Sequence, residues 1–154
     1  MTSSGPANWP PIGLRLNQTA RIVAHGFEQA MTEAGGSPAT WQVLLLVRSQ
    51  EWDTQSLIAD AMGISGATLT HHLNALEAEG LVRRWREHEN RRVQHVELTA
   101  EGTAMFERLR GAAVAYDKRL RSLLGEDGAT QLAELLDRLA PGLKAPATGV
   151  PDES

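Results

Sequence analysis

Residues 54–99 read TQSLIADAMGISGATLTHHLNALEAEGLVRRWREHENRRVQHVELT, and this stretch decides the fold. Its first half places apolar residues at steps of three and four, as helices do, whereas its last part alternates apolar and polar residues, as strands do. Gly63 separates the helical segments, and Gly80 precedes the change of period. The stretch therefore predicts two short helices followed by a hairpin of two strands.

Capping residues mark where each of the two helices begins and ends. The first begins at Thr54, ends at Gly63 and turns three apolar residues inward: Leu57, Ile58 and Ala61. The second is capped by Ser65, runs to about Glu79 and carries a leucine face: Leu69, Leu73 and Leu76. Two short helices joined by a glycine-containing turn and followed by a hairpin make a winged helix-turn-helix.

The hairpin is predicted from strands at 81–85 and 93–98, joined by the polar tip 86–92. In the second strand, Val96 and Leu98 share one face, and His95 and Glu97 share the other.

Helical segments flank this region on both sides. We expect an amphipathic helix over 10–34, a buried helix over 38–49, and helices over 99–124 and 127–140, separated at Gly125 and ending before Pro141. The inward face of the first comprises Leu16, Ala20, Val23, Phe27 and Ala30 or Met31. These outer helices hold more apolar residues than one small winged domain needs, which favours a homodimer.

The fold class is therefore mainly α with a small β-hairpin. The chain is expected to form a single domain over 1–154, in which 38–98 is the winged helix-turn-helix region. The helices at 10–34 and 99–140 serve dimerisation, and 1–8 and 144–154 are flexible tails.

Composition excludes several classes of protein. The 154 residues include no cysteine, so disulfides, thiolate metal sites and thiol sensing are excluded. No apolar stretch suits a membrane span and the start lacks the features of a signal peptide, so we expect a cytoplasmic protein. No phosphate-binding glycine loop, nucleophile motif or His-Glu-x-x-His motif is found, so neither an enzyme nor a cofactor is expected.

Charge is distributed unevenly along the chain. The formal net charge is −4, yet the window 83–92 holds five arginines and two glutamates. Phosphate contacts depend on the local patch rather than on net charge. An arginine at the tip of a narrow hairpin suits the minor groove of double-stranded DNA, where negative potential concentrates.

The polar face of the second helix provides groups for base edges. With the leucines inward, Thr68, Thr70, His71 and Asn74 project outward, and no bulky apolar residue obstructs the major groove. Each feature alone also suits an ordinary solvated surface, but the two together favour DNA binding. The candidate DNA-contacting residues are Ser65, Thr68, Thr70, His71, Asn74, Arg84, Asn90, Arg91 and Arg92.

The sequence resembles the MarR family of transcriptional regulators over about residues 12–140. The resemblance rests on LIADAMGIS at 57–65, TLTHHLNALEAEGLV at 68–82 and NRRVQHVELTAEG at 90–102. The family's wing pattern, Asp-x-Arg, three residues, then Val-x-Leu-Thr, is matched in register by Arg92, Val96, Leu98 and Thr99. The resemblance implies a homodimer, built from the first and last helices, that reads a pseudo-palindromic operator. It also implies that Arg92 enters the minor groove and that repression is the default.

Two positions depart from the family pattern. Asn90 stands where the family has Asp, so an uncharged amide replaces the carboxylate that orients the wing arginine. Asn74-Ala75 stands where the family often has Asp-Arg, which removes one ion pair and one phosphate contact. We infer altered base preference rather than lost binding.

The resemblance also implies a small aromatic anion as effector, bound between the dimer helices. An arginine beside aromatic rings suits such a ligand, and the candidate lining residues are His25, Trp41, Arg48 and Trp52. The competing interpretation makes Trp41 a core residue, Trp52 a loop anchor and Arg48 a charge at a helix end.

The sequence allows two other interpretations. His25 and Glu28 stand at i, i+3 and offer two metal ligands, but exposed helix residues explain them better, so no metal site is predicted. The alternative function is a winged domain that binds protein and has lost specific DNA binding, which the departures at Asn90 and Ala75 make conceivable.

Overall fold

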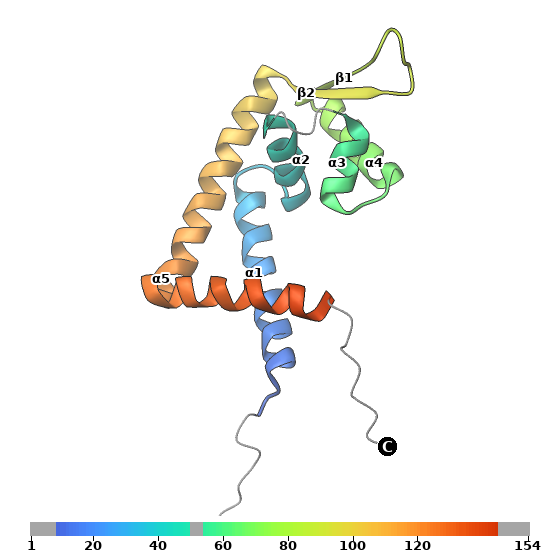
Figure 1. Cartoon of the computed structure of the whole chain (residues 1–154). Helices are drawn as coiled ribbons and strands as arrows, with labels where there is room; N and C mark the ends of the chain where they lie inside the picture. Colours follow the sequence, from blue (N-terminus) through green and yellow to red (C-terminus); the bar gives the residue numbers. More distant parts are fainter. Residues whose placement is uncertain (1–8, 50–53, 145–154) are drawn as a thin grey trace, which may run out of the picture. The chain divides into compact units, whose positions relative to one another are not determined.

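The structure is a computed structural model that describes residues 9–49 and 54–144. Its elements follow in the order α1 (Ile12–Glu33), α2 (Pro38–Ser49), α3 (Gln55–Met62), α4 (Gly66–Ala78), β1 (Val82–Arg86), β2 (Gln94–Leu98) and α5 (Ala100–Lys144) (Figure 1). The predicted fold class, mainly helical with one small hairpin, is confirmed. Both tails, 1–8 and 145–154, lie outside the described residues, as does Trp52.

The helix-turn-helix forms where the capping residues place it. The Thr54 side chain accepts a hydrogen bond from the Leu57 N–H at the start of α3, and Gly63 ends that helix with a left-handed φ of 68°. A residue with a Cβ is disfavoured at such a φ, which explains the glycine. Ser65 then caps α4 by accepting from the Thr68 N–H at 3.1 Å.

The core beneath α4 agrees with the sequence pattern, whereas the core beneath α3 differs by one or two positions. Leu69, Leu73 and Leu76 of α4 are buried. In α3 the buried residues are Ile58 and Ala59, while Leu57 is 40% exposed and Ala61 is also exposed. The inward face predicted for α3 was therefore wrong at Leu57 and Ala61, because eight residues are too few to define the helix face.

The hairpin is antiparallel, with Val82 opposite Leu98 and Trp85 opposite His95. β1 begins one residue later than predicted because Leu81 still takes part in the turn that ends α4, where its N–H donates to the Leu76 carbonyl oxygen at 2.9 Å. Val82 and Val96 are buried against the helices, whereas Arg83 and Trp85 are exposed.

The long helix α5 contains the predicted interruption. Gly125 has non-helical backbone angles, φ 74° and ψ 162°, so the segment consists of two helices that meet there. The second of these helices was expected to end before Pro141, but it continues to Lys144. Proline removes one N–H donor without preventing the last turn from keeping helical angles.

The chain divides into two compact units, residues 1–114 and 115–154. The first contains α1 to β2 and the start of α5, and its core includes Met31, Val43, Leu44 and Leu109. Within α1, Met31 is buried but the predicted inward residues Leu16 and Ala20 are exposed. In the described ranges, no helix is both long and apolar enough to cross a membrane.

The start of α5 approaches the chain between α4 and β1 closely. The Thr99 N–H donates to the Leu81 carbonyl oxygen at 3.1 Å, and the Thr99 hydroxyl donates to the Gly80 carbonyl oxygen at 2.5 Å. A Cβ placed on Gly102 would lie 1.9 Å from the Leu81 carbonyl oxygen. Only glycine therefore fits at residue 102 without displacing backbone.

We predict that Gly102→Ala lowers the free energy of unfolding by about 1–3 kcal/mol, because the added methyl group forces two backbone segments apart. Gly111→Ala is the matched control, since a Cβ at Gly111, also in α5, would meet no atom within 4 Å. Urea unfolding at one protein concentration measures both. Equal stability of the two variants would show that the contact is not restrictive.

Candidate nucleic-acid interface

The N-terminal turn of α4 carries two paired hydroxyl groups. The Ser65 and Thr68 hydroxyl oxygens lie 2.9 Å apart, and both residues are exposed. Farther along the same helix, His71 and Asn74 are also exposed. Four of the five candidate residues near or on α4 thus present polar groups to solvent from one short helix.

Thr70 differs from these four because its hydroxyl group is occupied within the fold. It donates to the Gly66 carbonyl at 2.9 Å and accepts from Gln55 Nε2 at 2.7 Å. Gln55 is the first residue of α3, so this hydrogen bond joins α3 to α4. The sequence analysis did not identify Gln55 as the partner of Thr70, because Gln55 is one polar residue among many.

Arg84 of β1 is turned toward α4. Its Nη2 donates to Asn74 Oδ1 at 2.5 Å and forms an ion pair with Glu77 Oε1 at 3.1 Å. The Arg84 backbone N–H also donates to Glu77, and its side chain is 11% exposed. Arg84 was expected among the DNA-contacting residues, but its guanidinium is engaged in fixing the wing strand to α4.

The contacts of Arg84 with Asn74 and Glu77 bear on the position of Asn74, where the family often has Asp. An ion pair was expected to be missing there, yet Glu77, one turn farther along α4, supplies it. The side-chain hydrogen bond from Arg84, and secondarily its charge, hold the pKa of the Glu77 carboxyl below the ordinary value of 4.5. Asn74 therefore keeps a defined orientation through a charged donor, although it has no charge itself.

The tip of the wing is organised by Asn90. Its side-chain Oδ1 accepts from the Arg92 N–H at 3.2 Å, and its carbonyl accepts from the Val93 N–H at 3.0 Å. The Asn90 side-chain amide thus accepts a hydrogen bond at this turn, although it carries no negative charge. Arg91 and Arg92 are exposed, and within the described ranges neither guanidinium forms a hydrogen bond or ion pair. Both arginines remain available to a partner.

The outer face of the wing carries a second set of contacts. Trp85 stacks on His95 with ring centroids 5.3 Å apart, and His95 Nε2 lies 2.7 Å from Glu87 Oε1. Arg83 forms an ion pair with Glu97 and lies 5.7 Å from the centroid of the Trp85 ring. Sequence reasoning did not single out Trp85, although the two-residue spacing of Arg83 and Trp85 already places both on one face.

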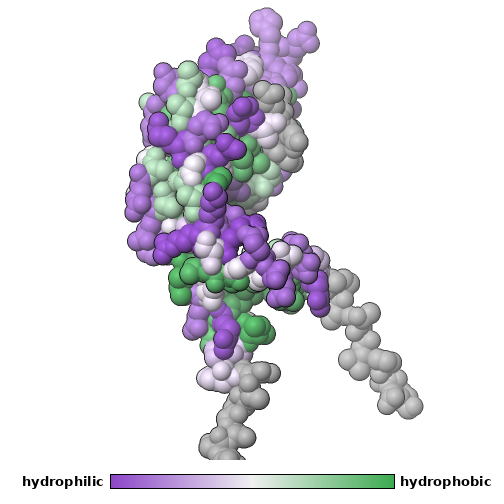
Figure 2. All heavy atoms as spheres, turned by 90° about the vertical axis from the view of Figure 1, so that its left-hand side faces the viewer, coloured by the Kyte–Doolittle hydropathy of each residue, from purple (hydrophilic) through white to green (hydrophobic). Residues whose placement is uncertain are grey.

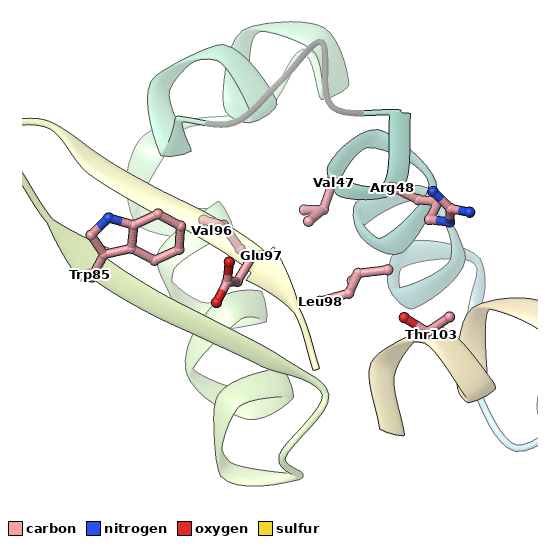
Figure 3. A pocket seen from close by; sticks show the side chains of 7 residues that line it. All are labelled: Val47, Arg48, Trp85, Val96, Glu97, Leu98 and Thr103. Carbon is pink, nitrogen blue, oxygen red and sulfur yellow. The ribbon is translucent and has the colours of Figure 1, made fainter. Parts of the chain in front are cut away.

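Three of the four effector candidates, His25, Trp41 and Arg48, lie within the described residues, where they do not form one site; Trp52 lies outside them. His25 is exposed on α1, and Trp41 stacks on Phe106 at 5.3 Å as part of the core packing. Arg48, at the end of α2, borders a hollow with a volume of about 650 Å³, whose other described lining residues are Val47, Trp85, Val96, Glu97, Leu98 and Thr103 (Figure 3). In the ranges that the structure describes, no group of three or more His, Asp or Glu residues suits a metal ion.

A short recognition helix, a hairpin wing and two exposed arginines at its tip define a winged helix-turn-helix of the DNA-binding type. A sequence profile of the MarR family matches residues 37–93. The transcriptional repressor MdtR of Bacillus subtilis strain 168 is 30% identical over 112 residues, which cover 73% of this chain and 72% of MdtR. The chain belongs to the MarR family of DNA-binding transcriptional regulators.

Solved structures agree with this assignment. The repressor CouR bound to a 23-mer DNA duplex is 31% identical, with a TM-score of 0.76 over 84% of this chain and 92% of CouR. A MarR mutant from E. coli in complex with operator DNA shares the fold, with a TM-score of 0.75 at 21% identity, over 86% of this chain and 95% of that one.

Because Arg84 joins α4 to the wing, we predict that Arg84→Met lowers the free energy of unfolding by about 0.5–1 kcal/mol, the range for a partly exposed pair. The pKa of Glu77 is lowered in the folded protein, so this contribution is present above pH 4.5 and is lost as the pH falls through the lower folded-state value. Urea unfolding at neutral and acidic pH measures the difference. Arg110→Met removes an exposed pair with Glu107 and is the control; an equal loss in both variants would contradict the assigned role.

Proposed function

We propose that this protein is a repressor that binds a pseudo-palindromic operator in double-stranded DNA as a homodimer and is released by a small molecule. The observation that carries the proposal is the Arg84 cluster, which joins the exposed polar face of α4 to the wing that ends in Arg91 and Arg92. A helix and a wing held in one orientation are what simultaneous reading of adjacent grooves requires.

The proposed contacts follow from the exposed groups. His71 and Asn74 face base edges in the major groove, and Ser65 and Thr68 face base edges or phosphates at the N-terminus of α4. Arg92 enters the minor groove, and Arg91 contacts phosphate. Thr70 and Asn90 take part by positioning α4 and the wing tip, respectively.

The proposed dimer rests on exposed apolar side chains in each unit. In the first unit they lie in the N-terminal half of α1, where Figure 2 shows apolar surface, and comprise Ile12, Leu14, Leu16 and Ile22. In the second unit they comprise Leu123, Leu124, Leu132, Leu135, Leu136, Leu139 and Leu143. Surface of this kind is costly in water, and a second copy of the chain would cover it.

Related proteins support repression and release. MdtR is a transcriptional repressor, and CouR, another repressor, has been solved both on DNA and with p-coumaroyl-CoA. By analogy we assign this chain a regulatory and non-enzymatic role in the cytoplasm. The alternative function is a protein-interaction module without specific DNA binding. These relatives give it no separate support.

The first experiment is selection of binders from a random duplex library with the full chain at moderate salt. We expect enrichment of an inverted repeat with half-sites about 10 bp apart, because two copies related by a twofold axis present two recognition helices. Affinity for the selected duplex should fall steeply as salt rises, since phosphate contacts release counterions. Failure to retain DNA even at low salt would refute the proposal and favour the protein-interaction module.

The wing arginine provides the sharpest single substitution. We expect Arg92→Ala to weaken binding to the selected duplex by about 1–3 kcal/mol, because its guanidinium has no competing partner among the described residues and is free for the groove. Fluorescence anisotropy at fixed salt measures the change. Arg110→Ala, on α5 and outside the α4–wing surface, should leave affinity unchanged, and equal affinities of the two variants would refute the wing assignment.

A further inference from the structure

Asn74, which is exposed on α4, carries a side-chain amide that can both accept and donate hydrogen bonds. Recognition of adenine in the major groove uses both ends of such an amide. The oxygen accepts from the adenine N6 amino group, and the NH₂ group donates to adenine N7. Which base Asn74 recognises therefore depends on which end of its amide is available.

Arg84 determines the orientation of this amide. Its Nη2 lies 2.5 Å from Asn74 Oδ1. A guanidinium has N–H donors and no acceptor, so only the oxygen of the amide can face it. The hydrogen bond is also charge-assisted, which makes it stronger than one between neutral groups. The oxygen of Asn74 is therefore held toward β1, and the NH₂ group takes the other position of the planar amide.

The Arg84 guanidinium is itself held by Glu77. The same Nη2 lies 3.1 Å from Glu77 Oε1, and the Arg84 backbone N–H donates to Glu77 Oε2 at 3.2 Å. The Arg84 side chain is only 11% exposed. Movement of Arg84 away from Asn74 would break the ion pair with Glu77 as well, so Asn74 meets a partner with its oxygen already occupied.

The NH₂ group of Asn74 is the available end. Among the residues that the structure describes, Asn74 Nδ2 has no hydrogen-bond partner. The oxygen keeps a second lone pair, but an adenine amino group that approached it would lie beside the positively charged Arg84 guanidinium. Two donors directed at one acceptor repel each other. Adenine therefore loses one of the two hydrogen bonds by which an amide recognises it.

We propose that Asn74 acts only as a hydrogen-bond donor and thereby selects guanine at the base that it contacts in each half-site. The major-groove edge of guanine presents two acceptors, N7 and O6, and no donor, which suits an NH₂ group. Cytosine presents its N4 amino group and is rejected, because two donors then face each other. Arg84 is the positioning residue that sets this preference without contacting the base. The inference rests on the proposed function, since it names a base of the proposed operator.

The test begins with the duplex selected from the random library. The full chain with Asn74→Ala, selected from the same library, should lose base preference at one position in each half-site, and this is the position that Asn74 reads. Four duplexes that differ only there, changed symmetrically in both half-sites, are then compared by fluorescence anisotropy at fixed salt. The unchanged protein should bind the guanine duplex about tenfold more tightly than the adenine or cytosine duplex, since each half-site gains one hydrogen bond.

Arg84→Met tests the role of the arginine. Its loss frees Asn74 Oδ1, so the amide can bind adenine through both ends, and the ratio of guanine to adenine affinity should fall from about ten to about one or below. Arg83→Met is the matched control, because Arg83 lies on the same strand but pairs with Glu97. It should keep the ratio. Each ratio is measured within one variant, so a general loss of affinity or stability does not alter it.

Asn74→Asp reverses the hydrogen-bonding character of the side chain at nearly constant shape. One carboxylate oxygen still accepts from Arg84, while the other replaces the NH₂ group with an acceptor. The preference should therefore move from guanine to cytosine, whose N4 amino group donates. The same four duplexes measure this change.

The outcomes separate this inference from the proposed function. The inference alone is overturned if an inverted repeat is selected but Asn74→Ala changes no position in it, or if the unchanged protein prefers a base other than guanine there. Equal ratios for Arg84→Met and Arg83→Met would also overturn it. Failure of the unchanged protein to select any duplex overturns the proposed function, and the reading role of Asn74 with it.

Discussion

Burial of one face of α4 is the constraint on which the rest of this structure depends. Leu69 and Leu73 are completely buried and Leu76 nearly so, and they pack with residues of α2, α3 and the wing. Burying a leucine contributes about 1.5–3 kcal/mol, so these three define the rotation of α4 about its axis. The opposite face then has to be the exposed one, which is why its polar residues present a surface for reading DNA.

Polar contacts fix how α3, α4 and the first wing strand are oriented relative to one another. Arg84 holds the first wing strand to Asn74 and Glu77, and Gln55 holds α3 to Thr70. Each bond is modest by itself, but together they join α3, α4 and β1. In a DNA-binding domain, such contacts matter less for stability than for the position of the recognition helix relative to the wing. Recognition of DNA depends on that geometry.

The wing has two ends with different surroundings. Its tip carries Arg91 and Arg92, and its base borders the hollow between Arg48 and Trp85. A two-stranded hairpin has few internal contacts to hold it, so its position depends on what packs at its base. The position of Arg91 and Arg92 therefore depends on how the base of the wing is held.

The sequence by itself determined the order of elements, their capping residues, the leucine face of α4 and the location of the arginines, because periodicity, caps and turns are local properties. It also indicated the family, through motifs confined to about 45 residues. Only the tertiary structure decided that Arg84 faces Asn74 and Glu77, that Trp41 packs on Phe106, and that Arg48 shares a hollow with Trp85. These pairs are separated by 7 to 65 residues in the chain and belong to different elements, so their contact depends on how helices and strands pack, which no local pattern encodes.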